Sequence, residues 1–226
     1  MNSMVDMRIE DARKMVIQAS LTILQKGLIV GSWGNISLKI EKDCFAITPS
    51  GRNYDKMKLD DIVIINADGK KMMGERTPSS ETKMHMAIYA ANPRFKAIVH
   101  THSTYATAVA AMRKPIPPLV EDMAHISGGM INVAPYAISG SEELAANAVA
   151  AMGDSNAVLL ANHGAVSCGK TLEEALTVAE LVEKSAQIYC ITASMGGGFL
   201  LDEKNIKTIR NFYKDHYSKR QAGKEL

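Results

Sequence analysis

The sequence predicts an α/β fold, in which a single domain has a central, mostly antiparallel sheet flanked by helices. Three observations lead to this fold class. Segments with strand and helix patterns interleave along the chain, and several strand candidates follow one another without an intervening helix. No internal repeat, low-complexity tract or linker-like stretch divides the 226 residues. A chain of this length can bury a substantial core without disulfides, so we expect one domain over residues 1–226.

Apolar periodicity and capping residues place the elements. Helices are expected over residues 6–26, from Ser79 or Ser80 to Asn92, over 103–112, over about 140–152 and from Thr171 to about 193. Strands are expected in short apolar runs over residues 36–40, 44–47, 62–65, 96–102 and 157–161. The glycine run at 196–198 predicts a loop before a C-terminal helix.

Two helix starts carry the signature of a capping box, in which a hydroxyl side chain and a glutamate three residues later satisfy free backbone N–H groups. Ser139 with Glu142 has this spacing, and so does Thr171 with Glu174. We expect Ser139 to cap the helix near 140–152 and Thr171 to cap the helix that follows.

Composition excludes several classes of function. Twenty-six Lys and Arg against 24 Asp and Glu give a net charge of +2, too weak to indicate nucleic acid or an anionic membrane as the main partner. No apolar run approaches the roughly 18–20 residues that a bilayer span needs, and the charged N-terminal segment does not resemble a signal peptide. Three widely spaced cysteines without a CxxC pair predict neither a disulfide framework nor a structural zinc site. We expect a cytoplasmic protein.

Two histidines two residues apart end the apolar run Ala-Ile-Val at 97–99. Side chains alternate along a strand, so His100 and His102 project from the same face. His163 follows the second buried run, AVLLA, and precedes a glycine that permits a sharp turn. Three histidines at converging strand ends match the open plan of a catalytic zinc site, which keeps a fourth position for substrate. The spacing fits three solvent-facing histidines equally well.

Three segments are rich in Gly, Ser and Thr: residues 31–37, 48–51 and 77–81. The last opens a helix, whose N-terminus presents free N–H groups and a partial positive charge to an anion. Hydroxyls and glycine amides of the other two loops can complete a phosphate cradle. Ordinary turns and a helix cap are the alternative for each loop alone. Glu81 lies in the first helical turn, either as a capping residue or as an acid/base or metal-ligand carboxylate beside the phosphate.

Five segments together resemble the class II sugar-phosphate aldolase/epimerase family, whose members include fuculose-phosphate aldolases and ribulose-phosphate 4-epimerases. They are GSWGNIS, ITPSG, SSETKMH, IVHTH and LLANHG, and they occur in the family's order between about residues 31 and 170. The resemblance implies a class II aldolase/adducin-like fold, assembled as a C4 homotetramer with active sites between neighbouring subunits. By the same resemblance, the substrate is a small-molecule sugar phosphate.

The resemblance also assigns roles to residues. His100, His102 and His163 match the ligands of Zn²⁺ or another divalent cation such as Mn²⁺, Co²⁺ or Fe²⁺. Glu81 matches the catalytic carboxylate and a further metal ligand of the resting enzyme. The positions that match the phosphate site are Asn35, Ser50, Gly51, Ser79 and Ser80.

The implied reaction is the reversible cleavage of a ketose 1-phosphate to dihydroxyacetone phosphate and an aldehyde. The cation acts as a Lewis acid that stabilises the enediolate, and Glu81 carries the proton at C3. No Schiff base is needed, so no lysine is nominated as a nucleophile.

Glu81 favours an aldolase over a 4-epimerase, because the family's epimerases carry Asp at this position. Glu121 and Asp122 lie in the loop that the family presents to the neighbouring site, where fuculose-type aldolases tend to have a tyrosine; this chain has none between 106 and 135. Tyr217, or alternatively Tyr213, is the candidate for the second family tyrosine.

The missing loop tyrosine leaves several substrates open. The candidates are fuculose-type or rhamnulose-type ketose 1-phosphates and the shortened 5-deoxyribulose or 5-methylthioribulose 1-phosphates. The alternative reactions are 4-epimerisation of ribulose 5-phosphate and dehydration of methylthioribulose 1-phosphate. A non-catalytic scaffold relative is disfavoured, because such members typically lose the metal histidines, and all three are present here.

Overall fold

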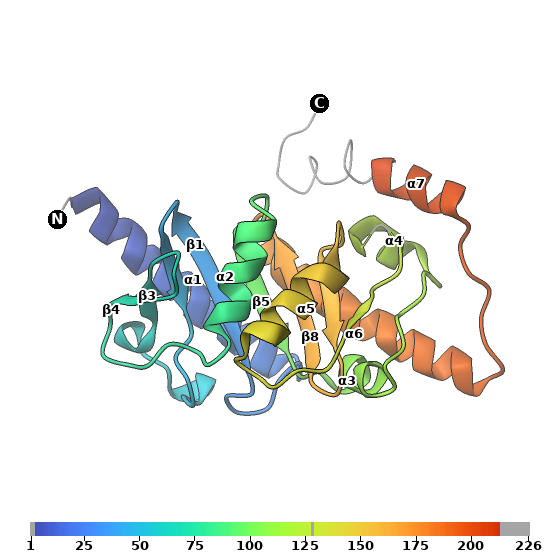
Figure 1. Ribbon diagram of the computed structural model, residues 1–226, viewed down its shortest axis with the longest axis horizontal. Helices are drawn as coiled ribbons and strands as arrows, with labels where there is room; N and C mark the ends of the chain where they lie inside the picture. The colour runs from blue at the N-terminus through green and yellow to red at the C-terminus, as the bar shows by residue number, and fades with distance from the viewer. Residues whose placement is uncertain (1–2, 128, 213–226) are drawn as a thin grey trace.

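The predicted architecture is confirmed by a computed structural model, which describes residues 3–127 and 129–212, without the side chains of residues 3–6, 125 and 126. One eight-stranded sheet runs through the described part of the molecule in the order β4-β3-β2-β1-β5-β8-β7-β6. Neighbouring strands are antiparallel except β6 and β7, which are parallel. Helices lie on both faces of the sheet (Figure 1).

The strands are β1 (Gly34–Glu41), β2 (Cys44–Ile47), β3 (Val63–Ile65), β4 (Lys71–Met73), β5 (Ala97–Thr101), β6 (Val133–Ala134), β7 (Ala157–Leu160) and β8 (Gly164–Gly169). The helices are α1 (Ser3–Gln25), α2 (Thr82–Ala91), α3 (Thr104–Ala111), α4 (Glu121–Ser127), α5 (Glu142–Met152), α6 (Leu172–Ser194) and α7 (Glu203–Phe212). Short 3-10 turns at Tyr54–Lys56 and Leu59–Asp61 connect β2 to β3. All five predicted strands and all five bounded helices are present, as is a helix after the glycine run.

Side-chain alternation divides the core into layers on the two faces of the sheet. Ile98 packs with α2 and α5 on one face, whereas its neighbours Ala97 and Val99 pack with α1 and the start of α6 on the other. A third cluster joins α3 and α6 to β7 and β8. Each fully buried Ile or Val of these layers stabilises the fold by about 1.5–3 kcal/mol relative to its exposed state. Both faces are covered, so the central strands are buried on both sides, and their polar residues, such as Asn35 and His100, are buried too.

The structure adds β4, β6, β8 and α4 to the sequence-based assignment. β8 has the sequence GAVSCG, which lacks a β-branched run and begins and ends with glycine, so local propensity gave no strand signal. Pairing with both β5 and β7 makes it a fully buried central strand. Tertiary pairing therefore decides this element.

One of the two capping predictions is wrong. The cap of α5 is Ser141, whose Oγ accepts a hydrogen bond from the backbone N–H of Leu144 at 3.0 Å. Ser139 lies two residues before that cap and turns into the molecule instead. The second prediction is confirmed, because Thr171 Oγ1 accepts from the N–H of Glu174 at 3.1 Å at the start of α6.

Strand register brings the chemically interesting segments together. β1 and β5 pair so that Asn35 lies opposite His100, and the turn between β7 and β8 carries His163 to the same end of β5. Gly164 makes this approach possible, since a Cβ atom there would lie 2.3 Å from the backbone oxygen of Thr101. The site is therefore built on three adjacent central strands, which are rigid elements.

Candidate metal centre and active site

Three histidines from the ends of β5 and β7 converge on one point. Each of His100, His102 and His163 offers a ring nitrogen within 4.8 Å of those of the other two. The rings stand edge to face, with centroids 4.7–4.8 Å apart. The Nε2 atoms of His100 and His102 are 2.9 Å apart. The expectation that these imidazoles share a face is therefore met, and the alternative of separate solvent-facing rings is not.

The backbone fixes which nitrogen of His100 faces inward. His100 is fully buried, and its Nδ1–H donates to the carbonyl oxygen of Ala165 on β8 at 2.9 Å. A carbonyl can only accept, so Nδ1 carries a proton and Nε2 is the ring nitrogen that points to the other two histidines. An outer hydrogen bond of this kind orients a metal-binding imidazole and sets its tautomer.

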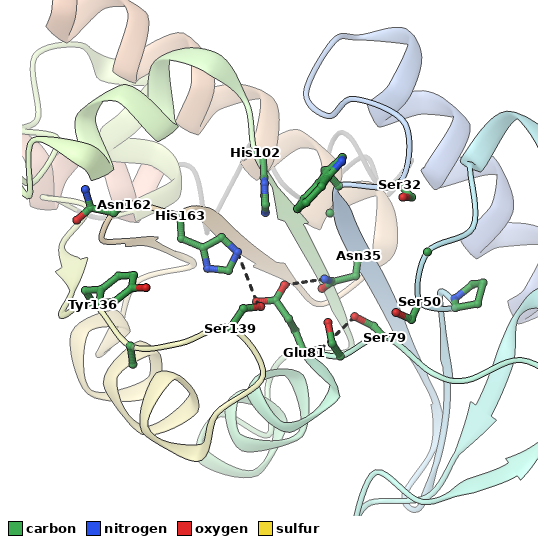
Figure 2. A pocket seen from close by; sticks show the side chains of 16 residues that line it. Ser32, Asn35, Ser50, Ser79, Glu81, His102, Tyr136, Ser139, Asn162 and His163 are labelled. Carbon is green, nitrogen blue, oxygen red and sulfur yellow. Dashed lines mark hydrogen bonds and ion pairs between the residues drawn. The ribbon is translucent and has the colours of Figure 1, made fainter.

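Glu81 at the start of α2 lies directly beside the three histidines. Its Oε2 is 3.0 Å from His100 Nε2, and its Oε1 is 3.5 Å from His163 Nε2. Asn35 Nδ2 donates to Oε2 at 2.8 Å, and Ser139 Oγ donates to Oε1 at 3.0 Å. Figure 2 shows the carboxylate of Glu81 between His163, Asn35 and Ser139.

Protonation in this cluster is set by burial and by the carboxylate. Burial raises the pKa of Glu81, but the neighbouring His100 outweighs it and leaves the pKa well below the usual range. Burial lowers the pKa of His100, and the Glu81 charge outweighs that effect and raises it. Burial, with His100 nearby, lowers the pKa of His102 to about 3 and that of His163 to about 4. Two of the imidazoles are thus neutral at pH 7, as metal ligands must be.

This donor set fits a divalent cation. A tetrahedral zinc with Zn–N bonds of about 2.0–2.1 Å holds its ligands roughly 3.3 Å apart, and the inward nitrogens are already close to that arrangement. A divalent cation placed between the inward nitrogens would also be attracted by the adjacent carboxylate. Three histidines with an open side match a catalytic rather than a closed structural site.

The predicted phosphate loops lie beside the histidines. Ser50 N donates to Thr77 O at 3.0 Å and Ser79 N donates to Thr48 O at 3.1 Å, so the two loops hold each other in place. Ser79 Oγ also accepts from the N–H of Glu81, which is the N-terminal cap residue of α2. One pocket of 410 Å³ is lined by Glu81, His102 and His163. The five residues assigned to the phosphate line the same pocket: Asn35, Ser50, Gly51, Ser79 and Ser80.

The lining of this pocket also includes residues that the sequence did not nominate individually. Trp33, the only tryptophan, is 68% exposed and its ring centre lies 6.2 Å from that of His102. Tyr136 is 54% exposed. In Figure 2 it lies on the side of His163 that faces away from His102. Ser139 and Asn162 also line it. Tyr136 falls one residue beyond the 106–135 interval in which a loop tyrosine was sought.

Two of the remaining nominated residues, Glu121 and Asp122, do not line this pocket. Glu121 and Asp122 begin α4, and Asp122 pairs with Lys184 on α6 at 2.5 Å. Neither acid is among the residues that line the pocket of its own chain. Tyr217 and Tyr213 lie outside the described residues. Contributions of these residues across a subunit boundary stay predictions.

The fold agrees with what comparisons with known proteins find. Residues 14–190 match the model of the class II aldolase and adducin N-terminal domain, so the chain belongs to the class II aldolase family. A solved L-fuculose 1-phosphate aldolase superposes with a TM-score of 0.88 at 37% identity, over 90% of this chain and 96% of that one.

Two relatives at similar identity are named as aldolases of sugar phosphates. The chain is 38% identical to 5-deoxy-D-ribulose 1-phosphate aldolase of Bacillus thuringiensis, over 90% of this chain and 95% of the relative. It is 37% identical to L-fuculose phosphate aldolase of Escherichia coli K12, over 80% of this chain and 84% of the relative. The chain is thus an enzyme of the class II aldolase family, a family that depends on divalent metal and also includes a 3-oxo-tetronate 4-phosphate decarboxylase. Within the described residues, no helix combines the length and apolarity needed to cross a membrane.

Proposed function

We propose that the protein cleaves a ketose 1-phosphate reversibly to dihydroxyacetone phosphate and an aldehyde. The observation that carries the proposal is one pocket that joins three groups. These are the histidine cluster, a carboxylate 3.0 Å from it, and two hydroxyl-rich loops at a helix start. A proton carrier beside a cation site and a phosphate cradle is what cleavage next to a carbonyl requires.

His100, His102 and His163 would hold the divalent cation, with Glu81 close enough to join them in the resting enzyme. When bound, the cation polarises the substrate carbonyl and stabilises the negative charge that develops beside it. The protein's own residues do the rest. The loops at 48–51 and 77–81 bind the phosphate through hydroxyl and backbone N–H groups, which fixes the position of C3.

Glu81 is the proposed proton carrier at C3. Its lowered pKa makes it a carboxylate in the resting site, so it can accept the C3 proton in the condensation direction. In the cleavage direction, the C3–C4 bond breaks and the C4 hydroxyl loses its proton as the aldehyde forms. Glu81 adds one proton to C3, so the proton released at C4 balances the one gained at C3. Asn35 and Ser139 hold the two oxygens of the carboxylate throughout.

Among the substrates, we propose a 5-deoxy or 5-methylthio pentulose 1-phosphate first and a fuculose-type substrate second. Trp33 and Tyr136 expose large aromatic surfaces in the pocket, and these surfaces favour an apolar substrate end over a hydroxylated one. The 5-deoxyribulose-phosphate aldolase relative supports the same order.

The test is a coupled assay for dihydroxyacetone phosphate with 5-deoxyribulose, fuculose and rhamnulose 1-phosphates and the metal-loaded protein. We expect release from at least one of them, with the highest kcat/KM for the deoxypentulose ester. Release from none, with epimerised, dehydrated or decarboxylated product from a sugar phosphate instead, refutes the aldolase. Higher kcat/KM for fuculose 1-phosphate reverses the order of substrates only.

A C4 homotetramer in the cytoplasm, with active sites between subunits, and Zn²⁺ as the resident ion complete the proposal. In this arrangement Glu121, Asp122 or Tyr217 of a neighbouring copy would approach the aldehyde end. Affinity alone does not decide whether Zn²⁺, Mn²⁺, Co²⁺ or Fe²⁺ is loaded at an imidazole site in the cell, because metal availability also decides.

A further inference from the structure

A fourth histidine lies behind the metal centre and is not part of it. His85 is on α2, one helical turn after Glu81, and is fully buried. It is not among the three histidines that converge on the cation site, and it does not line the pocket. A buried imidazole needs a reason, because burying a polar ring without partners costs free energy.

The two ring nitrogens of His85 bind two side chains of β1. Nε2 is 2.5 Å from Asn35 Oδ1, and Nδ1 is 2.7 Å from Ser37 Oγ. Asn35 and Ser37 are two residues apart on the strand, so both side chains face α2. Ser37 Oγ is also 2.9 Å from Tyr89 Oη, one turn further along the helix.

The direction of every hydrogen bond in this network follows from the Glu81 carboxylate. A carboxylate only accepts, so the group of Asn35 that faces it at 2.8 Å is the NH₂ group, and Oδ1 faces His85. Oδ1 only accepts, so Nε2 of His85 carries the proton. Nδ1 then accepts from Ser37, and Ser37 accepts from Tyr89. Burial lowers the pKa of His85 to about 3, which keeps the ring neutral with a single N–H.

We propose that His85 is a positioning residue that locks the side-chain amide of Asn35, so that one N–H of Asn35 holds the catalytic carboxylate and the other faces the substrate pocket. Without the His85 N–H, the side-chain amide of Asn35 is free to rotate by 180°, which exchanges its oxygen and its NH₂ group. Its oxygen would then face Glu81 Oε2, and two acceptors in a buried site repel each other. His85 therefore acts on the reaction only through Asn35. This inference rests on the proposed role of Glu81.

The kinetic test compares His85→Leu, which removes both ring hydrogen bonds, with His85→Gln, which keeps an N–H at the end of the side chain. We expect His85→Leu to lower kcat about 10–100-fold, as loss of an outer hydrogen bond typically does. KM should change by a smaller factor than kcat, because the serines and Gly51 of the phosphate loops are untouched and Asn35 is only one of the residues assigned to the phosphate. Metal content per chain should stay at the wild-type level. His85→Gln should recover most of kcat.

Two further variants separate positioning from a general structural effect. Tyr89→Phe removes the far end of the network without touching Asn35 and should keep kcat within about twofold. Asn35→Ala combined with His85→Leu should be no slower than Asn35→Ala alone, because His85 has then lost the group through which it acts. Additive losses in this double variant, or no recovery in His85→Gln, overturn the proposal.

The protonation state of the His85 ring can be measured without an activity assay, and also if His85→Leu does not fold or the wild-type protein releases no triose phosphate. The ¹⁵N spectrum of histidine-labelled wild-type protein at pH 7 should show His85, assigned through His85→Gln, protonated at Nε2 and unprotonated at Nδ1. The opposite tautomer, or a doubly protonated ring, overturns the proposed network. A failure of the aldolase assay with the expected tautomer counts against the proposed function and not against the lock on Asn35.

Discussion

Glu81 combines two roles that a single substitution can separate. Glu81→Gln keeps the size of the side chain and leaves the three histidines in place, but it removes the group that carries the proton. We expect wild-type metal content and a loss of turnover of about 10²–10⁴-fold. The check is metal analysis together with the triose-phosphate assay on the same preparation. Full activity of Glu81→Gln would contradict the assigned role.

His102 tests the metal centre itself. It is the cluster residue whose Nε2 lies 2.9 Å from that of His100, and it stands just beyond the end of β5. We expect His102→Ala to lose both bound metal and activity. Its circular dichroism should stay native, because the residue is partly exposed and outside the sheet. Wild-type metal content in this variant would remove His102 from the ligand set.

The lowered pKa of His85 leads to a prediction of how the free energy of unfolding depends on pH. Its pKa is about 3 in the folded protein, lowered by burial, against about 6.5 in an unfolded chain. The unfolded state therefore binds the proton first as pH falls, and stability is lost progressively below pH 6.5. Between pH 7 and pH 5 this histidine alone should lower the free energy of unfolding by about 2 kcal/mol.

The measurement is urea unfolding of the metal-free protein at pH 7 and pH 5. The lowered pKa values of His102, His163 and Glu81 act in the same direction, and the raised pKa of His100 acts against them. His85→Gln leaves those groups in place, so the difference between its pH slope and that of wild type isolates His85. Equal slopes would show that the ring does not stay neutral.

At the scale of elements, two serines near the start of α5 differ in what they do. Ser141 caps the helix, whereas Ser139 donates to Glu81. We expect Ser141→Ala to cost about 1 kcal/mol of stability, measured by urea unfolding, with unchanged kcat. Ser139→Ala should change kcat severalfold with little change in stability. A loss of stability in Ser139→Ala, together with a changed kcat in Ser141→Ala, would indicate that Ser139 is the helix cap after all.

The sequence suggested the wrong serine for a physical reason. Ser139 and Glu142 have the spacing of a capping box, and so a local pattern was satisfied. Ser139 is instead drawn to a carboxylate 58 residues away, because the loop at 135–141 packs against the start of α2. Gly140 allows this close packing, since a Cβ there would lie 2.8 Å from Ser80 O.

For the whole molecule, the metal should contribute to stability as a ligand that binds only the folded state. The cation site joins the ends of β5 and β7, which are far apart in the sequence. Removal of metal with a chelator should lower Tm, and Zn²⁺ in excess should restore it. His102→Ala is the matched control and should show no change on chelation. A Tm unaffected by the chelator in wild type would contradict a resident metal.

The sequence alone determined the chemistry and most of the elements. Strand alternation put His100 and His102 on one face, apolar runs located the central strands, and the ordered motifs indicated the family. These signals are local, because each depends on backbone period or on a few neighbouring residues. Only the tertiary structure decided β8, the partner of Ser139 and the bonds from His85 through Asn35 to Glu81. The side-chain hydrogen bonds among these join residues 46 to 58 positions apart, and their geometry comes from how α2, α5 and the sheet pack together.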